Sequence, residues 1–153
     1  MKSLELKIPP PLLAAALAAA IWGVSRITPL LDLPAAARLI VAAAIVLVGV
    51  GFSVFGMAAF RRAKTTLNPM KPELASSLVS TGVYQITRNP MYVGLLFGLA
   101  GWAVFLSSGW AFLGPLGFFF YMDRFQIIPE ERVLAAMFGA EYAAYQAKVR
   151  RWL

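Results

Sequence analysis

Three long apolar stretches constrain the fold more than any other feature of the sequence. Residues 39–60 contain no charged residue and end at a pair of arginines, and residues 9–31 contain a single charge. Residues 89–122 form a longer uncharged stretch of 34 residues. A bilayer core about 30 Å thick is crossed by roughly 20 apolar helical residues. The stretches therefore predict a helical integral membrane protein.

The third stretch is too long for one crossing, because a helix of that length would measure about 51 Å at 1.5 Å per residue. The Ser-Ser-Gly sequence at residues 107–109 provides a turn signal near its middle. A chain of 153 residues is the length of one domain. We therefore predict an all-α integral membrane protein with one domain, residues 1–153, and four transmembrane helices at about residues 10–30, 38–60, 91–106 and 110–128.

The composition limits the chemistry that the chain can perform. Hydrophobic residues make up 60% of the chain and charged residues 14%, whereas soluble domains carry roughly 25% charged residues. The absence of cysteine excludes disulfides and thiolate nucleophiles. The absence of histidine removes the commonest general base and metal ligand. We expect no metal site, and any reaction must use carboxylates, Arg, Lys, Tyr, Ser, Thr, Asn or backbone groups.

The net charge of +7 is distributed unevenly over the predicted loops. Only Arg26 and Arg38 flank the loop between the first two helices. Basic residues concentrate in the cytoplasmic loops of membrane proteins, so we predict that both termini and the active site are cytoplasmic. Because the basic residues bracket membrane spans, we do not expect a nucleic-acid partner. The predicted cytoplasmic side carries Lys2, Lys7, Arg61, Arg62, Lys64, Lys71, Arg88, Arg132, Lys148, Arg150 and Arg151, with Arg124 near it.

Two predicted cytoplasmic segments hold most of the polar residues. The connection at residues 61–90 is unusually long, and its Pro69, Pro72 and Gly82 argue against one continuous helix. Residues 129–153 are predicted to form an amphipathic C-terminal helix, because apolar and aromatic residues recur there every three or four positions. The members of this stripe are Leu134, Phe138, Tyr142, Tyr145, Val149 and Trp152.

Several polar residues in these segments have an ordinary structural explanation. Glu130 and Glu131 would complement the dipole at the N-terminus of the tail helix. Arg88 would serve as a basic anchor beside the third crossing. Asp123 is different, because a charge near the end of an apolar helix is costly unless it is paired or close to water. We expect Arg124 or Arg88 to be its partner.

Both cytoplasmic segments contain motifs of a known family. The stretch LVSTGVYQITRNPMYVG resembles the signature L-V-x-x-G-x-Y-x-x-x-R-[HN]-P-x-Y-x-G. The stretch PEERVLAAMFGAEYAAYQAKVRRWL resembles its companion, E-E-x-x-L-x-x-x-F-G-x-x-Y-x-x-Y-x-x-x-V-x-R-W. Together they resemble the isoprenylcysteine carboxyl methyltransferase family, which is itself similar to phospholipid N-methyltransferases. The resemblance covers roughly residues 65–153, and the first 60 residues match only as two membrane helices.

The resemblance implies that S-adenosylmethionine is the methyl donor and binds at the cytoplasmic ends of the helices, under the C-terminal segment. The motif positions carried over are Leu78, Val79, Gly82 and Tyr84 for the adenosyl group, Arg88, Asn89, Pro90 and Tyr92 for the methionine end, and Glu130, Glu131, Phe138 and Tyr142 from the tail.

The chemistry of these residue types agrees with that implication. Arg88 offers a bidentate fork for a carboxylate, Asn89 adds a donor and an acceptor, and Glu130 or Glu131 supplies acceptor oxygens. Methyl transfer from a sulfonium requires alignment of the reacting atoms more than strong acid–base groups. A chain without histidine or cysteine therefore has what the reaction needs.

Two positions depart from the family pattern. Asn89 stands where many members have histidine, which removes any proton-handling role at that position. Gln126 stands where eukaryotic members often carry arginine, and Arg124 lies one helical step away and would substitute for it. We take Glu131, Arg124 and Asn89 as candidate catalytic residues. Glu131 is expected to point into the site, because it shares its helical face with the apolar stripe of the tail.

The function favoured by the sequence is a membrane S-adenosylmethionine-dependent methyltransferase. Its acceptor would be a lipophilic molecule that enters from the bilayer, and membrane lipids are its expected partners. A phospholipid amine N-methyltransferase is the alternative enzyme. A small non-enzymatic transport or scaffold protein is the alternative from another class. The sequence leaves open which acceptor atom is methylated and which oligomeric state the protein adopts.

Overall fold

The computed structural model describes residues 4–65 and 68–153. Lys2 of the predicted basic side and a short part of the predicted 61–90 segment lie outside these ranges. The helices are α1 (Pro10–Ser25), α2 (Ala35–Ala63), α3 (Pro90–Leu106), α4 (Leu113–Tyr121) and α5 (Ile128–Lys148), with short helical turns η2 (Pro72–Leu74), η3 (Gly82–Gln85) and η4 (Gly109–Phe112) and the π-helix η5 (Met122–Ile127). The described ranges contain no strand apart from one isolated bridge. The predicted all-α class is confirmed.

The sequence sets where several helices begin and end. α1 and α3 each begin with proline, which suits a first helical position because its missing N–H has no partner there. α3 ends at Leu106 and α2 at Ala63, because the residues that follow them, Ser107 and Lys64, adopt the left-handed conformation that stops a helix (φ 53° and 50°). α1 ends earlier than predicted, at Ser25, whose hydroxyl donates to the carbonyl of Trp22.

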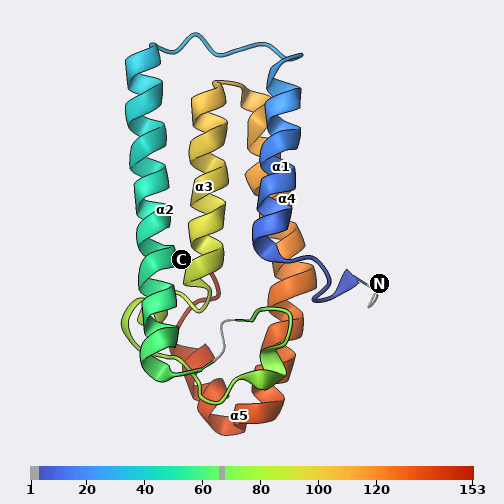
Figure 1. Cartoon of the computed structure of the whole chain (residues 1–153), viewed down its shortest axis with the longest axis vertical. Helices are drawn as coiled ribbons and strands as arrows, with labels where there is room; N and C mark the ends of the chain where they lie inside the picture. The colour runs from blue at the N-terminus through green and yellow to red at the C-terminus, as the bar shows by residue number, and fades with distance from the viewer. Residues whose placement is uncertain (1–3, 66–67) are drawn as a thin grey trace.

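The helices α1, α2, α3 and α4 run side by side, and α3 packs against the other three (Figure 1). The α2–α3 contact is close because both helices present small residues there. A Cβ atom added at Gly94 would lie 2.6 Å from the carbonyl oxygen of Gly49 and 2.0 Å from the hydroxyl of Ser53. Small residues let helix backbones approach in this way. Gly98, in contrast, faces open space.

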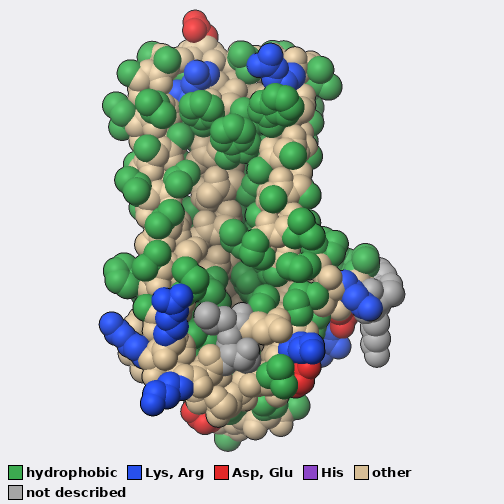
Figure 2. Space-filling model, in the orientation of Figure 1, with side chains coloured by type: hydrophobic (Ala, Val, Ile, Leu, Met, Phe, Trp, Pro, Cys, Tyr) green, Lys and Arg blue, Asp and Glu red, His purple; other side chains and the backbone are tan. Residues whose placement is uncertain are grey.

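On the face shown in Figure 2, many apolar side chains and no charged groups lie along the middle of the bundle, and charged groups gather near its ends. Large apolar residues such as Leu47 and Phe55 on α2 and Phe120 on α4 are exposed. Among the described residues, α2 alone is both long and apolar enough to cross a membrane, and α1 and α3 are shorter apolar helices. The four predicted crossings correspond to helical segments, but their passage through a bilayer stays a prediction.

The fourth predicted crossing and the tail helix have different boundaries from those predicted. The helix of residues 113–148 continues from α4 through η5 into α5 with no break at Pro129. α5 is instead interrupted at Gly139, whose backbone is non-helical (φ 49°, ψ −121°). The helix ends at Lys148, and Val149 is extended. The predicted helix over residues 129–153 was therefore wrong in its last residues, because these pair with the 87–89 segment.

The end of the bundle that carries the 61–90 connection also carries the N-terminal segment and α5 (Figure 1). The backbone N–H of Leu6 donates to the carbonyl of Phe125 (3.0 Å), and Glu5 pairs with Arg132 (2.6 Å). The structure therefore places these segments together, as four crossings predict. Which side of a membrane they face remains a prediction.

Candidate active site

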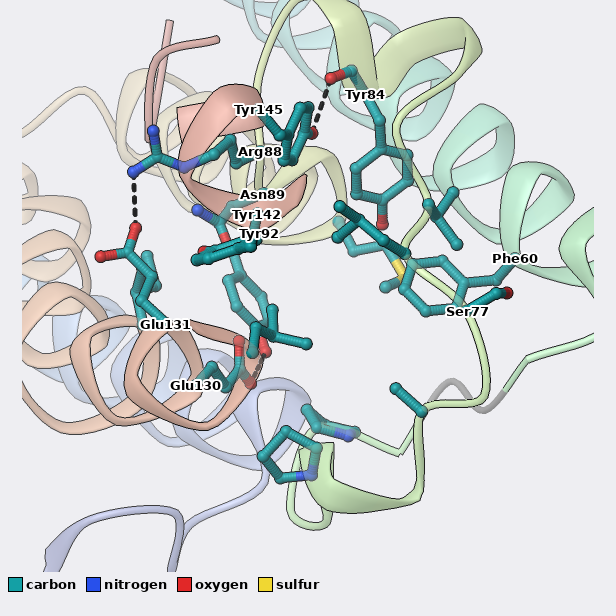
Figure 3. Close-up of a pocket in the computed structure, with 18 of the residues that line it drawn as sticks. Phe60, Ser77, Tyr84, Arg88, Asn89, Tyr92, Glu130, Glu131, Tyr142 and Tyr145 are labelled. Carbon is teal, nitrogen blue, oxygen red and sulfur yellow. Dashed lines mark hydrogen bonds and ion pairs between the residues drawn. The ribbon is translucent and has the colours of Figure 1, made fainter. Parts of the chain in front are cut away.

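A partly open cavity lies where the 61–90 connection meets α3 and α5. Figure 3 shows the labelled polar and aromatic side chains around it. Nine residues predicted from the motifs line this cavity, namely Leu78, Val79, Tyr84, Arg88, Asn89, Tyr92, Glu130, Glu131 and Tyr142.

Aromatic and aliphatic side chains form one wall of the cavity. Tyr84 packs edge-on against Phe60 of α2, with ring centroids 5.5 Å apart. Tyr145 of α5 donates its hydroxyl to the carbonyl oxygen of Tyr84 (2.7 Å), and Tyr142 lies beside it. Burial raises the pKa of Tyr142 to about 12, so this hydroxyl is neutral at physiological pH. The wall is apolar with polar tips, which suits a heterocyclic ligand.

Glu130 is partly buried and is the more desolvated of the two acids that line the cavity. Its Oε1 accepts hydrogen bonds from the Tyr92 hydroxyl and from the amide Nε2 of Gln126, both at 2.5 Å. No cation within the described ranges forms an ion pair with it. Burial raises its pKa from 4.5 to about 7, because the two hydrogen bonds only partly offset the loss of solvation. Near neutral pH this carboxyl is thus present in both protonation states.

Glu131 belongs instead to an ion network of four residues: Glu131, Arg88, Arg151 and Asp123. Its two oxygens pair with Arg88 (2.6 Å) and Arg151 (2.6 Å). Arg151 also forks onto Asp123 at 2.9 and 3.2 Å. Burial would raise the pKa of Glu131, but hydrogen bonds from Arg151 and Arg88 and their charges outweigh it and hold the pKa below 4.5. The two adjacent glutamates therefore differ in pKa, which is raised for Glu130 and lowered for Glu131.

Backbone carbonyls of residues 149–151 hold Arg88 and Asn89 in place. The N–H of Arg88 donates to the carbonyl of Arg150 (2.9 Å), and its guanidinium donates to the carbonyl of Val149 (2.6 Å). The side-chain amide of Asn89 donates to the carbonyl of Arg151 (2.9 Å), as does the hydroxyl of Thr87 (3.1 Å). Arg88 and Asn89 are thus oriented by residues about sixty positions away in sequence.

Four predicted site residues do not line the cavity. Arg124 is 47% exposed and lies near Glu5 (3.7 Å). Gly82 forms a turn with φ +62°, and Pro90 is buried at the start of α3. Phe138 packs with the tyrosine wall from outside. We do not retain Arg124 as a catalytic candidate, because its exposed side chain does not line the cavity.

The expected partner of Asp123 was also wrong. Neither Arg124 nor Arg88 pairs with it, and Arg151 does. Glu131 lines the cavity as expected, with Arg88 and Arg151 as its partners, and Glu130 lines it as well. Asp123 is reached by Arg151, a partner 28 residues away that spacing along one helix does not indicate.

Residues that sequence reasoning did not assign to the site contribute much of it. Arg151 is the most important, because it joins Glu131 to Asp123. The only signal for it was its position in the R-W pair that ends the second motif. Gln126, which departs from the family pattern, bridges Glu130 and the carbonyl of Pro69 (2.7 Å). The lining residues that the motifs did not assign are Phe60, Asn68, Pro69, Pro72, Ala75, Ser77, Met91, Ile127, Leu134 and Tyr145.

Comparison with known proteins identifies related sequences. The profile of a family described as "Phospholipid methyltransferase" matches residues 37–141. An uncharacterized protein of Haemophilus influenzae is 44% identical over 63 residues, which are 41% of this chain and all of that protein (100%). Protein-S-isoprenylcysteine O-methyltransferase B of Arabidopsis thaliana is 35% identical over 91 residues, 58% of this chain and 45% of that protein.

The Protein-S-isoprenylcysteine O-methyltransferase of Saccharomyces cerevisiae is 34% identical over 87 residues, 52% of this chain and 33% of that protein. The chain therefore spans less than half the length of the two methyltransferases that it matches. No solved structure matches the chain.

Proposed function

The chain belongs to the phospholipid methyltransferase family, and we propose that it is an integral membrane methyltransferase that uses S-adenosylmethionine to methylate a lipophilic acceptor. The motif resemblance to isoprenylcysteine carboxyl methyltransferases is confirmed by the relatives it matches. The observation that carries the proposal is the cavity, in which motif residues from the connection and α3 converge with those of α5, although Tyr92 and Glu130, for example, are 130 − 92 = 38 residues apart.

The donor set of the cavity fits the proposed cofactor. The Nε of Arg88 is buried and has no hydrogen-bond partner within the described ranges, although the rest of its guanidinium is paired. This nitrogen and the remaining capacity of Asn89 would hold a carboxylate, and Glu130 would accept from a ribose hydroxyl. The walls of Phe60 and Leu78 would pack on adenine. Bound there, S-adenosylmethionine would supply an electrophilic methyl group.

The residues of the chain would act mainly by positioning. Arg151 fixes Glu131, and Glu131 in turn fixes Arg88, so the arginine is held in one orientation before any ligand binds. Such preorganisation lowers the entropy cost of aligning the reactants. Glu130 can receive a proton from an acceptor near neutral pH, because its pKa of about 7 is close to that pH. Asn89 and Glu131 therefore serve binding and orientation in this proposal.

A membrane setting explains why the acceptor would be lipophilic. The bundle exposes large apolar side chains along α1, α2 and α4, and a soluble protein rarely exposes a continuous apolar surface of that extent. We propose that α1, α2, α3 and the α4–η5 segment cross the bilayer, with the cavity and both termini on the cytoplasmic side. Membrane lipids then surround the protein, and the acceptor reaches the cavity from the bilayer.

The proposal is tested by binding of labelled S-adenosylmethionine to the purified chain in detergent. Arg88→Ala should weaken binding by roughly 30-fold or more, because losing one partner of a buried charged pair costs about 2–5 kcal/mol. Arg62→Ala, which removes an exposed arginine from the end of α2, is the matched control and should bind normally. A folded Arg88→Ala protein with normal affinity would refute the cofactor assignment of this cavity.

A phospholipid amine is a second candidate acceptor, and a specific observation favours it. Glu130 is the cavity carboxyl without a cationic partner in the described ranges, whereas Arg88 is already paired. Such a site attracts a protonated amine more than a prenylated cysteine carboxylate. Methylation assays that offer phosphatidylethanolamine and a prenylated cysteine in parallel separate the two acceptors. A chain that binds the cofactor but methylates neither acceptor, nor any component of a lipid extract, favours a non-enzymatic role.

A further inference from the structure

A second cavity lies at the opposite end of the bundle from the candidate active site. This far-end groove is lined mainly by Trp22, Arg26, Arg38, Trp102 and Phe105. Figure 2 shows the corresponding end of the molecule, where basic side chains are surrounded by apolar surface. It shares no lining residue with the first cavity.

The far-end groove contains two positive charges without a counter-ion. Neither Arg26 nor Arg38 has a carboxylate oxygen within 4.0 Å among the residues that the structure describes, although Asp32 lies in the same loop. The Nε of Arg38 is buried and makes no hydrogen bond there. The guanidinium of Arg38 instead lies 5.6 Å from the centroid of the Phe105 ring. A partly desolvated guanidinium with an unused donor is a favourable site for an anion.

Hydrogen bonds fix the two loops beside the far-end groove. The N–H of Leu31 donates to the carbonyl of Ser107 (2.6 Å), and the hydroxyl of Ser107 donates back to the carbonyl of Leu31 (2.9 Å). The hydroxyls of Thr28 and Ser108 are 2.9 Å apart. These contacts attach the loop after α1 to the turn after α3, and both serines are buried. The loop between Arg26 and Arg38 is therefore held in place.

The position of the groove identifies the kind of anion. Arg38 precedes Arg61 on α2 by 61 − 38 = 23 residues, which is about 35 Å along the helix. This separation is close to the thickness of a bilayer core, about 30 Å. If Arg61 lies at one interface, the groove lies at the other, where phospholipid phosphates are located. Indole rings such as that of Trp22 are also typical of this level.

We propose that the far-end groove binds the phosphate of an anionic phospholipid, with Arg26 and Arg38 as donors. The acyl chains lie on the exposed apolar side chains of α1 and α2, such as Trp22, Leu39 and Ile40. Apolar walls of this kind favour a lipid over a free phosphate ion, which would leave them in contact with water. This inference goes beyond the proposed methyl transfer and rests only on the proposed membrane location.

The test measures lipid retention by native mass spectrometry of the full chain in non-ionic detergent. Phosphatidylglycerol and phosphatidylcholine with the same acyl chains are added in parallel, and we expect one phosphatidylglycerol per chain to be retained about tenfold more tightly. The Arg26→Gln/Arg38→Gln variant should lose that preference. Arg61→Gln/Arg62→Gln removes equal charge from the other end of α2 and should keep it.

Three results would overturn the inference: no preference in the unmodified chain, a preference kept by the far-end variant, or an equal loss in both double variants. Displacement of the lipid by glycerol phosphate at the same concentration would also overturn it, by assigning the groove to a soluble phosphate. Arg38→Lys, which keeps the charge but removes Nε, should retain part of the preference if folding is intact. S-adenosylmethionine binding measured on the same samples separates failure of this inference from failure of the proposed function.

Discussion

The adjacent acids Glu130 and Glu131 should respond to pH in opposite ways. The pKa of Glu130 in the folded chain is about 7, against an ordinary value of 4.5. Because this pKa is raised, the folded state holds the proton more tightly than the unfolded state, and folding is favoured most below pH 4.5. That stability is lost as the pH rises through 7. The pKa of Glu131 is lowered, so its stabilising contribution is present above pH 4.5 and is lost in acid.

The size of the Glu130 effect follows from its shift. The difference of 7 − 4.5 = 2.5 pKa units corresponds to about 3 kcal/mol at 1.36 kcal/mol per unit. Glu130→Gln keeps an oxygen that can accept from Tyr92 and Gln126 but cannot ionise. We therefore expect the unmodified chain to lose about 3 kcal/mol in its free energy of unfolding between pH 4.5 and pH 8.5. Glu130→Gln should not show this loss.

Glu131→Gln should behave differently at the same pH. It leaves Arg88 and Arg151 without their shared carboxylate, and breaking a buried pair costs about 3–5 kcal/mol. Because Arg151 is 32% exposed, solvent reduces this loss, and we expect about 2–4 kcal/mol at pH 8.5. Glu141→Gln is the matched control on the exposed face of α5 and should change the free energy of unfolding by less than about 0.5 kcal/mol.

The assay is equilibrium unfolding in mixed detergent micelles, followed by tryptophan fluorescence from pH 4.5 to pH 8.5. The expected order of stability at pH 8.5 is Glu130→Gln above the unmodified chain and Glu131→Gln below it. Identical pH profiles for the unmodified chain and Glu130→Gln would show that this carboxyl is not buried as described. A loss in Glu130→Gln as large as that in Glu131→Gln would refute the separation of the two acids.

Three further predictions concern the ion network, the α2–α3 contact and the orientation in the membrane. Arg151→Gln should lower the free energy of unfolding by about 1–3 kcal/mol in the same assay, which is between the values for exposed and buried ion pairs; no loss would show that the ion network is not stabilising. Gly94→Ala should cost about 1–3 kcal/mol through overpacking against α2, whereas Gly98→Ala, which faces open space, should be neutral or stabilising, and equal effects would contradict the α2–α3 contact. A cysteine at Leu33, which is 47% exposed, should react with an impermeant thiol reagent added outside cells, and one at Ala147 should not; the reverse pattern would invert the proposed orientation.

The helical architecture could be predicted because it depends on local properties of the sequence. The uncharged run at residues 39–60 needs only length and hydropathy to indicate a helix, and α2 extends over it from Ala35 to Ala63. The start of α3 at Pro90 and its end near the Ser-Ser-Gly turn are likewise encoded by a few adjacent residues. The two motifs also predicted nine of the residues that line the cavity.

The roles of the acids could not be predicted, because they depend on partners from distant segments. A regular helix places Glu131 on the face of the apolar stripe, and it does line the cavity together with Leu134. Its partners Arg88 and Arg151 lie 43 and 20 residues away along the chain. Glu130 lines the same cavity and accepts a hydrogen bond from Tyr92, 38 residues away. No spacing within residues 129–153 indicates which acid meets the arginines, so the difference between the two acids is visible only in three dimensions.

The structure of the last described residues could not be predicted for a second reason, because their hydrogen-bond partners are distant in the sequence. Amphipathic spacing predicts a helix up to Trp152, but a helix would use the carbonyls of Val149 and Arg151 internally or leave them at its end. The structure uses these carbonyls as acceptors for Arg88 and Asn89 instead. Leaving the donors of Arg88 and Asn89 without partners would cost about 1–3 kcal/mol each. Pairing them therefore stabilises the fold more than one further helical turn would. The first motif is therefore oriented by the end of the second, which explains why a cavity built from both requires the last residues of the chain.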